Sequence, residues 1–197
     1  RQVSSAASDV YKRQNLTTEG KYIIDSSGDQ VLLRGFNFGG WMLQEPYMFQ
    51  FSGAAISQTD FRNKLINFIG EDNTNEFYDV WLENFITEAD VEALSNHGFN
   101  SIRLPMHYNL FTLPTHLEPN AGENTWLDIG FDLVDNLLDW CQQNNIYLIL
   151  DLHAAPGGQG YGSDINDYDP NYPSLWESEA NKNKTISLWG KIAERYH

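Results

Sequence analysis

The stretch "IYLILDLHAAPGGQG", residues 146–160, decides the fold class. Residues 146–150 are apolar at odd and even positions alike, which is typical of a strand covered on both faces, as in parallel sheets. Asp151 and His153 follow, and then a loop rich in glycine and proline. Because binding and chemistry gather at the C-terminal ends of parallel strands, the stretch predicts a strand that delivers polar side chains to a site.

Outward from this stretch, strands alternate with helices. Residues 21–35 predict a hairpin whose second strand, residues 31–36, enters a glycine-rich loop, and residues 99–105 predict a strand that ends at Pro105. Thr87 and Asp90 form a capping-box pattern at the start of one helix. Apolar spacing predicts helices around residues 61–69, 77–85, 87–97, 127–141 and 186–196. The alternation favours βαβ units and a parallel α/β sheet.

Loop lengths favour a particular parallel fold. The helix-to-strand loops are short, as in "NHGFN" and "QQNNIY", whereas the strand-to-helix loops are long. This asymmetry is typical of a (β/α)8 TIM barrel, and the glycine motif of a doubly wound dinucleotide fold is missing after the first strand. A full barrel needs about 250 residues. We therefore expect residues 15–197 to be the N-terminal half of a barrel domain, with only the first three βα units present.

Two further expectations follow from this organisation. Residues 1–14, "RQVSSAASDVYKRQ", have no apolar period and resemble a vector or adapter remnant that packs against nothing. A barrel cut after three strands would leave an unpaired parallel edge beside residues 146–150, which favours aggregation.

Composition narrows the possible partners. The net charge of −15 disfavours nucleic acid and anionic membrane surfaces. No apolar run approaches the ~18 residues of a membrane span. The single cysteine, Cys141, excludes an intrachain disulfide and is expected to be buried.

Strand parity places three polar side chains together. Asn37, Arg103 and His153 sit near the ends of the three predicted strands, and we expect them to converge on one face. A buried guanidinium is normally paired. An ion pair between Arg103 and Asp151 is therefore the structural alternative to a binding role, and it is compatible with one because it would also orient Arg103.

Three segments carry a family resemblance. "LLRGFNFGGW" with "EP" just after it, "HGFNSIRLPMHYNLF" and "LILDLHAAPGGQ" resemble the first three strand motifs of glycoside hydrolase family 5, the cellulase and β-glucanase family of clan A. The resemblance implies that Arg103 and His153 bind the sugar. It also implies a retaining mechanism with two glutamates, on the fourth and seventh barrel strands. We expect both glutamates beyond His197, so that residues 1–197 contain no catalytic residue and are inactive alone.

Loop residues complete the candidate site. Glu45 in "QEP" is either a substrate contact or a carboxylate that fixes the loop, and His107 could line the cleft. Sugar rings stack on aromatic faces, so Trp41, Tyr108, Tyr161 and Trp176 are candidate platforms, whereas Trp81 and Trp189 lie at helical core spacing. His97 and His116 are expected at the surface.

No metal or cofactor is expected. Asp164, Asp167 and Asp169 have spacings that suggest calcium but lack the glycine and terminal glutamate of an EF-hand loop.

The resemblance implies hydrolysis of O-glycosidic bonds in β-glucan-type polysaccharides by a full-length protein, monomeric and extracellular or periplasmic. The alternative is a non-catalytic carbohydrate-binding protein on the same barrel. A metal-dependent hydrolase would instead show His-x-His at the first strand end, where this chain has "FNFGG".

Overall fold

A computed structural model describes residues 16–51 and 53–196. Its sheets are an antiparallel pair, β1–β2, and a parallel sheet of three strands in the order β3–β4–β5. The strands are β1 (Thr17–Glu19), β2 (Tyr22–Ile24), β3 (Gly35–Asn37), β4 (Ser101–His107) and β5 (Tyr147–Ala154). The helices are α2 (Gln58–Ile69), α3 (Glu71–Asn84), α4 (Glu88–Asn96), α5 (Asp128–Gln143), α6 (Ser163–Asn166) and α7 (Glu179–Tyr196), with short 3-10 turns η1 (Tyr108–Leu110) and η2 (Thr115–Leu117).

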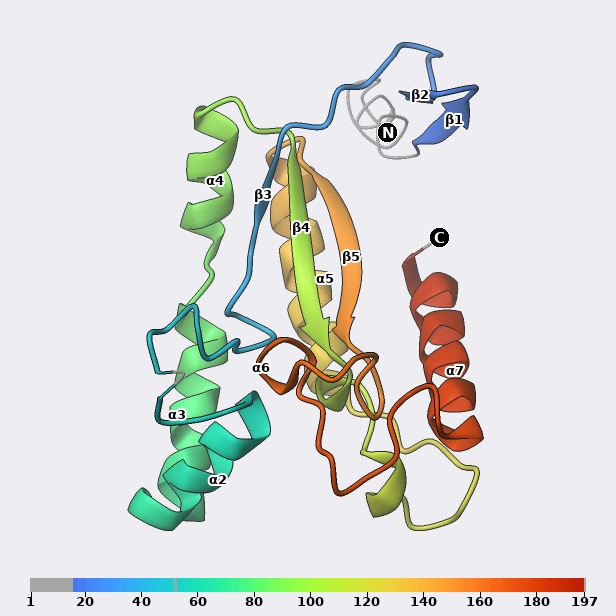
Figure 1. Cartoon of the computed structure of the whole chain (residues 1–197). Coiled ribbons are helices and arrows are strands. Elements are labelled where there is room, and N and C mark those ends of the chain that lie inside the picture. Colours follow the sequence, from blue (N-terminus) through green and yellow to red (C-terminus); the bar gives the residue numbers. More distant parts are fainter. Residues whose placement is uncertain (1–15, 52, 197) are drawn as a thin grey trace, which may run out of the picture.

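The parallel sheet confirms the predicted α/β class. The three strands point the same way, α5 runs behind β4 and β5, and the β1–β2 hairpin lies at the opposite end of the sheet from α6 (Figure 1). Along the chain, helices α2 to α4 lie between β3 and β4, and α5 lies between β4 and β5. The long loops that follow the strands therefore collect at one end, where the site was expected. The prediction for residues 1–14 lies outside the described residues.

Strand limits differ from the prediction at two places. β4 does not end at Pro105 but continues to His107, with an irregular register between these two residues. The strand predicted over residues 31–36 is shorter, because β3 begins only at Gly35. The predicted hairpin around the turn at residues 25–29 is reduced to an isolated bridge between Ile24 and Gln30. Residues between this bridge and β3 carry the chain from the hairpin to the parallel sheet.

The main core lies between the parallel sheet and its helices. Ile102, Leu104 and Met106 of β4 share the parity opposite to Arg103 and are completely buried. They meet apolar residues of α5, including Cys141, which is buried as predicted. Each fully buried aliphatic side chain contributes about 1.5–3 kcal/mol. Burial also raises the pKa of the Cys141 thiol to about 12, so the thiol stays protonated and unreactive.

The predicted capping box of α4 is confirmed. The Asp90 carboxylate accepts a hydrogen bond from the Thr87 backbone N–H at 2.8 Å, while the Thr87 side chain caps the backbone of the first turn. Beyond the helix, Gly98 adopts a φ of 81°, where a side chain would be strained. Local sequence therefore fixes both ends of this helix.

Helix α7 buries a different face from the one predicted. Ile186 and Trp189 are 69% and 39% exposed, so the expectation that Trp189 belongs to the core is wrong. The buried positions are Asn181, Lys184, Leu188 and Ile192. Asn181 and Lys184 can be buried on this face because they bind Thr115 and Glu118, which lie in the loop between β4 and α5. The spacing of apolar residues in the helix could not predict these partners.

The buried partner of Lys184 is Glu118, in the loop between β4 and α5. Both side chains are 2% exposed, and the Lys184 ammonium also donates to the Thr112 hydroxyl at 3.2 Å. Burial by itself would raise the pKa of the Glu118 carboxyl, but hydrogen bonds from Lys184 and Thr125 outweigh it and leave the pKa below its usual value. This ion pair fastens the loop to α7.

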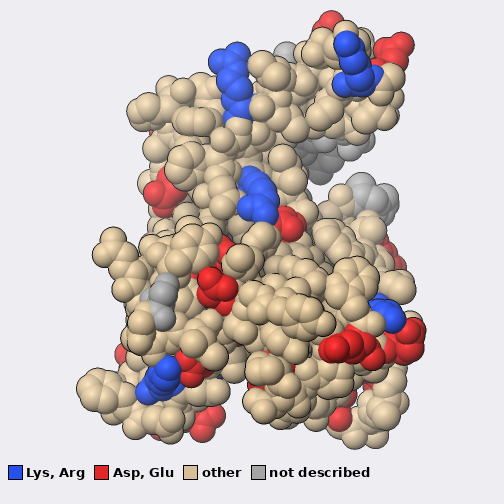
Figure 2. All heavy atoms as spheres, in the orientation of Figure 1, with Lys and Arg blue, Asp and Glu red and all other residues tan. Residues whose placement is uncertain are grey.

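Charged side chains of both signs are scattered over the face shown in Figure 2, where lysine and arginine form no patch. Within residues 16–51 and 53–196, no helix combines the length and the apolar character needed to cross a bilayer.

Replacing Lys184 with alanine should destabilise the protein by about 3–5 kcal/mol, because it leaves the Glu118 carboxylate buried without a counter-charge. Lys182→Ala is the matched control on the same helix. Lys182 pairs with the 81% exposed Glu179, and its loss should cost at most about 1 kcal/mol. Chemical denaturation measures both, and equal losses would contradict the role given to the buried pair.

Candidate functional site

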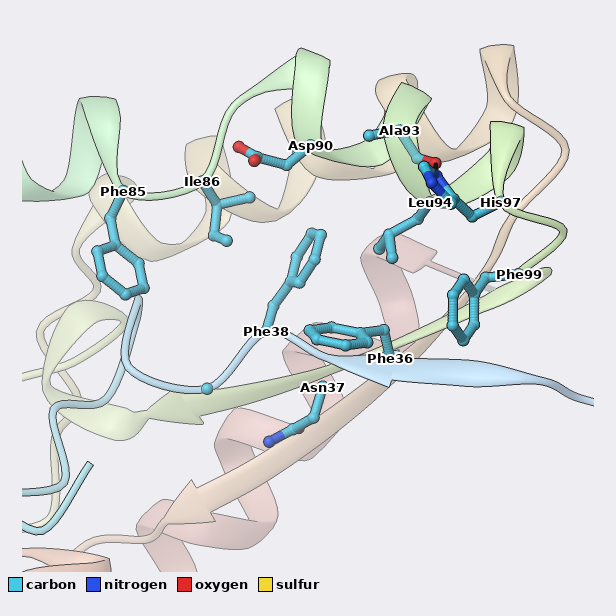
Figure 3. A pocket seen from close by; sticks show the side chains of 11 residues that line it. Phe36, Asn37, Phe38, Phe85, Ile86, Asp90, Ala93, Leu94, His97 and Phe99 are labelled. Atoms are coloured by element: carbon cyan, nitrogen blue, oxygen red, sulfur yellow. Dashed lines mark hydrogen bonds between the residues drawn. The ribbon is translucent and has the colours of Figure 1, made fainter. Parts of the chain in front are cut away.

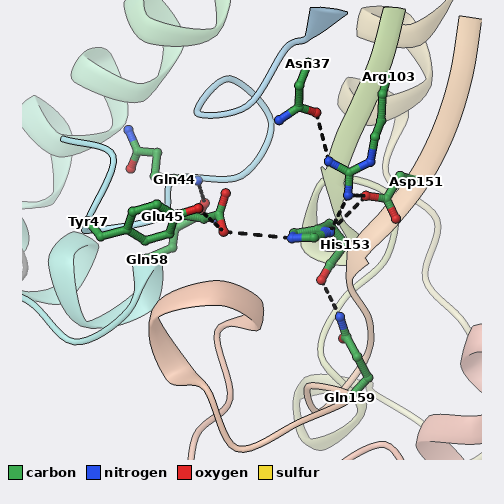
Figure 4. A network of polar contacts seen from close by, with 9 residues as sticks. All are labelled: Asn37, Gln44, Glu45, Tyr47, Gln58, Arg103, Asp151, His153 and Gln159. Carbon is green, nitrogen blue, oxygen red and sulfur yellow. Dashed lines mark hydrogen bonds and ion pairs between the residues drawn. The ribbon is translucent and has the colours of Figure 1, made fainter. Parts of the chain in front are cut away.

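Four polar side chains form one network at the C-terminal ends of the parallel strands (Figure 4). The Arg103 guanidinium donates through Nη1 to Asn37 Oδ1 at 2.9 Å and through Nη2 to Asp151 Oδ2. His153 Nδ1 lies 2.9 Å from Asp151 Oδ2 and 3.0 Å from Arg103 Nη2. Asn37, Arg103 and His153 thus meet as strand parity predicted. The predicted ion pair of Arg103 with Asp151 is present as well, but it is partly exposed rather than buried.

The register explains this convergence. Asn37 and Arg103 are direct partners across β3 and β4, and Asp151 is the partner of Pro105, two residues beyond Arg103. All these positions share one parity, so their side chains leave the same face of the sheet. A guanidinium can then reach both neighbouring strands at once.

Glu45 closes the network from the loop after β3. Its Oε1 lies 3.8 Å from His153 Nε2 and accepts a hydrogen bond from the Tyr47 hydroxyl at 3.3 Å. The carboxylate is almost fully buried. Burial raises the pKa of Glu45, and the nearby His153, the Tyr47 hydroxyl and Arg103 oppose that rise. The imidazole therefore sits between two carboxylates, Glu45 and Asp151.

A group of aromatic rings anchors the loop that carries Glu45. Phe49 and Phe51 of this loop stack on each other, and their rings contact Trp81 and Phe61 on the helices α3 and α2. Tyr78 of α3 donates to the Gln44 side chain at 2.9 Å. The α2–α3 pair thus holds Glu45 in place, whereas Phe68, near the C-terminal end of α2, is 85% exposed.

His107 does not line an open cleft, as the sequence had suggested. It is 1% exposed, and its Nε2 lies 3.0 Å from Asp167 Oδ2 while its Nδ1 accepts from the Asn109 N–H. Asp167 also accepts from the backbone N–H of Thr59 at 2.8 Å, in the first turn of α2. His107 and Asp167 therefore join the end of β4 to α2. They are buried beneath the polar network and do not line an open surface.

The aromatic candidates separate into buried and exposed rings. Trp41 is 2% exposed, and its indole N–H donates to the Leu82 carbonyl at 2.8 Å. A ring this buried has no free face for a sugar, so we remove Trp41 from the candidate site. Tyr108 packs against the same core, and burial raises the pKa of its hydroxyl. Trp176 and Tyr161 are 66% and 77% exposed and remain candidates.

Sequence reasoning missed Gln159 and Tyr47. The Gln159 side chain accepts from the Ala155 N–H and donates to the His153 carbonyl. Gln159 follows His153 by six positions, and Tyr47 follows Glu45 by two. Both stand in loops, where the path of the backbone determines which side chains come into contact. No periodic signal in such loops could have pointed to them.

An apolar pocket of about 410 Å³ lies elsewhere, between β3 and α4 (Figure 3). Its polar neighbours are already engaged, since Asp90 caps α4 and His97 Nδ1 lies 2.7 Å from the Ala93 carbonyl. Asn37 points away from the phenyl rings, towards the other face of β3 (Figure 3). The pocket is lined mainly by Phe36, Phe38, Phe85, Ile86, Leu94 and Phe99. It offers apolar contact but no converging polar groups.

The described residues contain no cluster of three or more histidine, cysteine, aspartate or glutamate side chains arranged to hold a metal ion. Asp167, one of the three aspartates with calcium-like spacing, is already paired with His107.

The chain is similar to known proteins. The family model described as "Cellulase (glycosyl hydrolase family 5)" matches residues 57–197. The chain is 33% identical over 183 residues to a β-xylosidase of Phanerodontia chrysosporium, covering 92% of the chain and 36% of that protein. It is 26% identical over 168 residues to a probable glucan 1,3-beta-glucosidase A of Aspergillus fumigatus, covering 84% of the chain and 38% of that protein.

One solved structure shows the same fold. The crystal structure of the rutinosidase from Aspergillus niger aligns with a TM-score of 0.60 at 20% identity, covering 81% of this chain and 42% of that one. The chain therefore belongs to glycosyl hydrolase family 5, a family of clan A with the TIM-barrel fold. It spans little more than a third of the length of the curated relatives named above.

Replacing Asp167 with asparagine should lower the unfolding free energy by about 1–3 kcal/mol at pH 7, because charged hydrogen bonds to His107 and Thr59 are lost. Burial alone would raise the pKa of Asp167, but the contacts with His107, Ser57 and Thr59 leave it below the usual value. A lowered pKa stabilises the fold above the unfolded-state value, about 3.9, and this contribution disappears as the pH falls through the folded-state value.

The difference between wild type and variant should therefore be largest above about pH 5 and shrink below about pH 4. Urea denaturation across this range measures it. Asp164→Asn, at an exposed position of α6 just before Asp167, is the control and should show no such profile. A pH-independent loss in Asp167→Asn would contradict the charged pairing.

Proposed function

We propose that the full-length protein to which this chain belongs is a retaining β-glycosidase that hydrolyses β-glucan-type polysaccharides. The observation that carries the proposal is the network of Asn37, Arg103, Asp151 and His153, with Glu45 beside it, at the C-terminal ends of parallel strands. We infer that this network binds the sugar next to the cleaved bond. The β3, β4 and β5 strands would then be the first three of eight barrel strands.

The network suits sugar hydroxyls. A hydroxyl both donates and accepts, so it needs a fixed donor and a fixed acceptor side by side. Arg103 and Asn37 supply donors, Glu45 and Asp151 supply acceptors, and the mutual contacts hold each side chain in one orientation before substrate arrives. Arg103 keeps 40% of its side chain exposed, and His153 keeps 25%, so both remain accessible. Prior orientation reduces the entropy lost on binding.

Within the described residues, Glu45 and Asp151 do not form the catalytic pair. Retention needs two carboxyl groups roughly 5 Å apart with the glycosidic bond between them. Here the His153 ring stands between the two carboxylates, at 3.8 Å from Glu45 and 2.9 Å from Asp151. We therefore propose that the acid/base and the nucleophile are glutamates on strands outside residues 1–197. The present residues would bind and orient the sugar.

The place of action follows from the substrate class. A polymeric glucan cannot cross a bilayer, so we propose that the full-length protein works outside the cytoplasm, in the extracellular space or the periplasm. The names of the relatives, β-xylosidase and glucan 1,3-beta-glucosidase, leave several β-linked glycans open.

Arg103→Lys in the full-length protein should lower kcat/KM on soluble β-glucan about 10- to 100-fold. Lysine keeps the charge but cannot reach Asn37 and Asp151 at once, so charged hydrogen bonds of about 1.5–3 kcal/mol are lost. Assays on β-1,3- and β-1,4-linked glucans measure the effect and the linkage. Arg195→Lys, which changes an exposed pair with Asp135, is the control and should retain full activity. The proposed function would be wrong if the wild type hydrolysed no β-glycoside.

A further inference from the structure

Helix α7 carries a sequence motif that the proposed function does not use. Residues 183–185, Asn-Lys-Thr, match the Asn-x-Ser/Thr pattern at which an oligosaccharide is attached to an asparagine side chain in secreted proteins. A second match, at Asn15, begins outside the described residues. Because so short a pattern also arises by chance, its meaning depends on where the structure places Asn183.

Asn183 lies on the outer side of α7. The buried residues of this helix are Asn181, Lys184, Leu188 and Ile192. Leu188 and Ile192 belong to the main core of the parallel sheet. At 3.6 residues per turn, Asn183 points to the opposite side of the helix, and it is exposed. In a (β/α)8 barrel the helices form the outer ring, so this side of α7 faces solvent in the full-length protein as well.

The Asn183 amide is unengaged, and the space around it is open. Within residues 16–51 and 53–196 no hydrogen bond holds this amide, whereas the helical Asn73 and Asn84 amides donate to carbonyls four positions earlier. Gly190 lies two turns further along the same side. Apart from its chain neighbours and the helix backbone, no described atom lies within 4 Å of the place that a Cβ of Gly190 would take. A bulky group on Asn183 therefore has room along the helix.

We propose that Asn183 is an N-glycosylation site of the full-length protein. The reaction joins Asn183 Nδ2 to the anomeric carbon of an oligosaccharide carried on a lipid diphosphate. The bond between that carbon and the diphosphate breaks, the lipid diphosphate leaves with the electron pair, and the amide nitrogen gives up one proton to a base of the transferase. The proposal rests on the proposed function only for the place of action outside the cytoplasm.

The structure indicates that transfer precedes the folding of α7. In the folded helix the Thr185 hydroxyl, which the pattern requires, donates to the Asn181 carbonyl at 2.9 Å. A transferase therefore has to bind the motif before the helix forms. Folding then turns Lys184 inward and leaves Asn183 with its glycan outside. The glycan would lie beside Ile186, which is 69% exposed, and would shield that apolar side chain from other molecules.

The test is secretion of the full-length protein from yeast. Cleavage after glutamate releases residues 180–194, which contain Asn183 but not Asn15. Enzymatic removal of a glycan in heavy-oxygen water converts the modified asparagine to aspartate that carries the isotope, which mass spectrometry detects in this peptide. Asn183→Gln should abolish the glycan, and Thr185→Ser should keep it. Asn136→Gln, at an exposed asparagine of α5 outside any such pattern, is the control and should leave the glycan in place.

Activity on soluble β-glucan separates this proposal from the proposed function. If the secreted wild type hydrolyses glucan but its 180–194 peptide carries no isotope, the glycosylation site is wrong and the proposed function survives. If the peptide carries the isotope but no glycoside is hydrolysed, the site stands without the proposed function. Thr185→Ala keeps Asn183 but removes the required hydroxyl. Isotope that persists in this variant would come from spontaneous deamidation and would overturn the site.

Discussion

The pairing of Arg103 with Asp151 is the constraint on which the site depends. The Arg103 guanidinium lies on the sheet face opposite the core and keeps 40% of its side chain exposed, so the pairing fixes its orientation more than it adds to stability. Its partners come from both neighbouring strands, Asn37 from β3 and Asp151 from β5. A slip of one residue in either strand would send these partners to the opposite face. The ion pair therefore depends on the strand register.

The loops at this end of the sheet are held by tertiary contacts of a different kind. Aromatic packing on α2 and α3 fixes the loop with Glu45, and the His107–Asp167 pair ties the end of β4 to the start of α2. The Lys184–Glu118 pair fastens the loop before α5. Each contact joins segments far apart in the chain, so the site is assembled by the whole sheet end rather than by one motif.

Among the described residues, the strand ends and the loop after β5 present different kinds of side chain. The strand ends supply hydrogen-bonding groups in fixed positions, and the long loop after β5 supplies exposed aromatic faces. The proposed sugar substrate would need both, because a sugar ring has polar edges and apolar faces. Gln159 links the two parts, since it contacts the strand end through its side chain and Trp176 through its backbone.

The sequence by itself determined the α/β class, the parallel strands, the capping box of α4 and the convergence of Asn37, Arg103 and His153. These features depend on local periodicity and parity, which are written along the chain. The sequence could not determine which aromatic rings are buried. Trp41 and Trp176 both stand in glycine-rich loops, yet only the fold shows that one fills the core while the other faces solvent.

The buried face of α7 was hidden for the same reason, because Lys184 is buried only where Glu118 meets it. Burial and pairing are relations between distant segments, and the tertiary structure alone decides them.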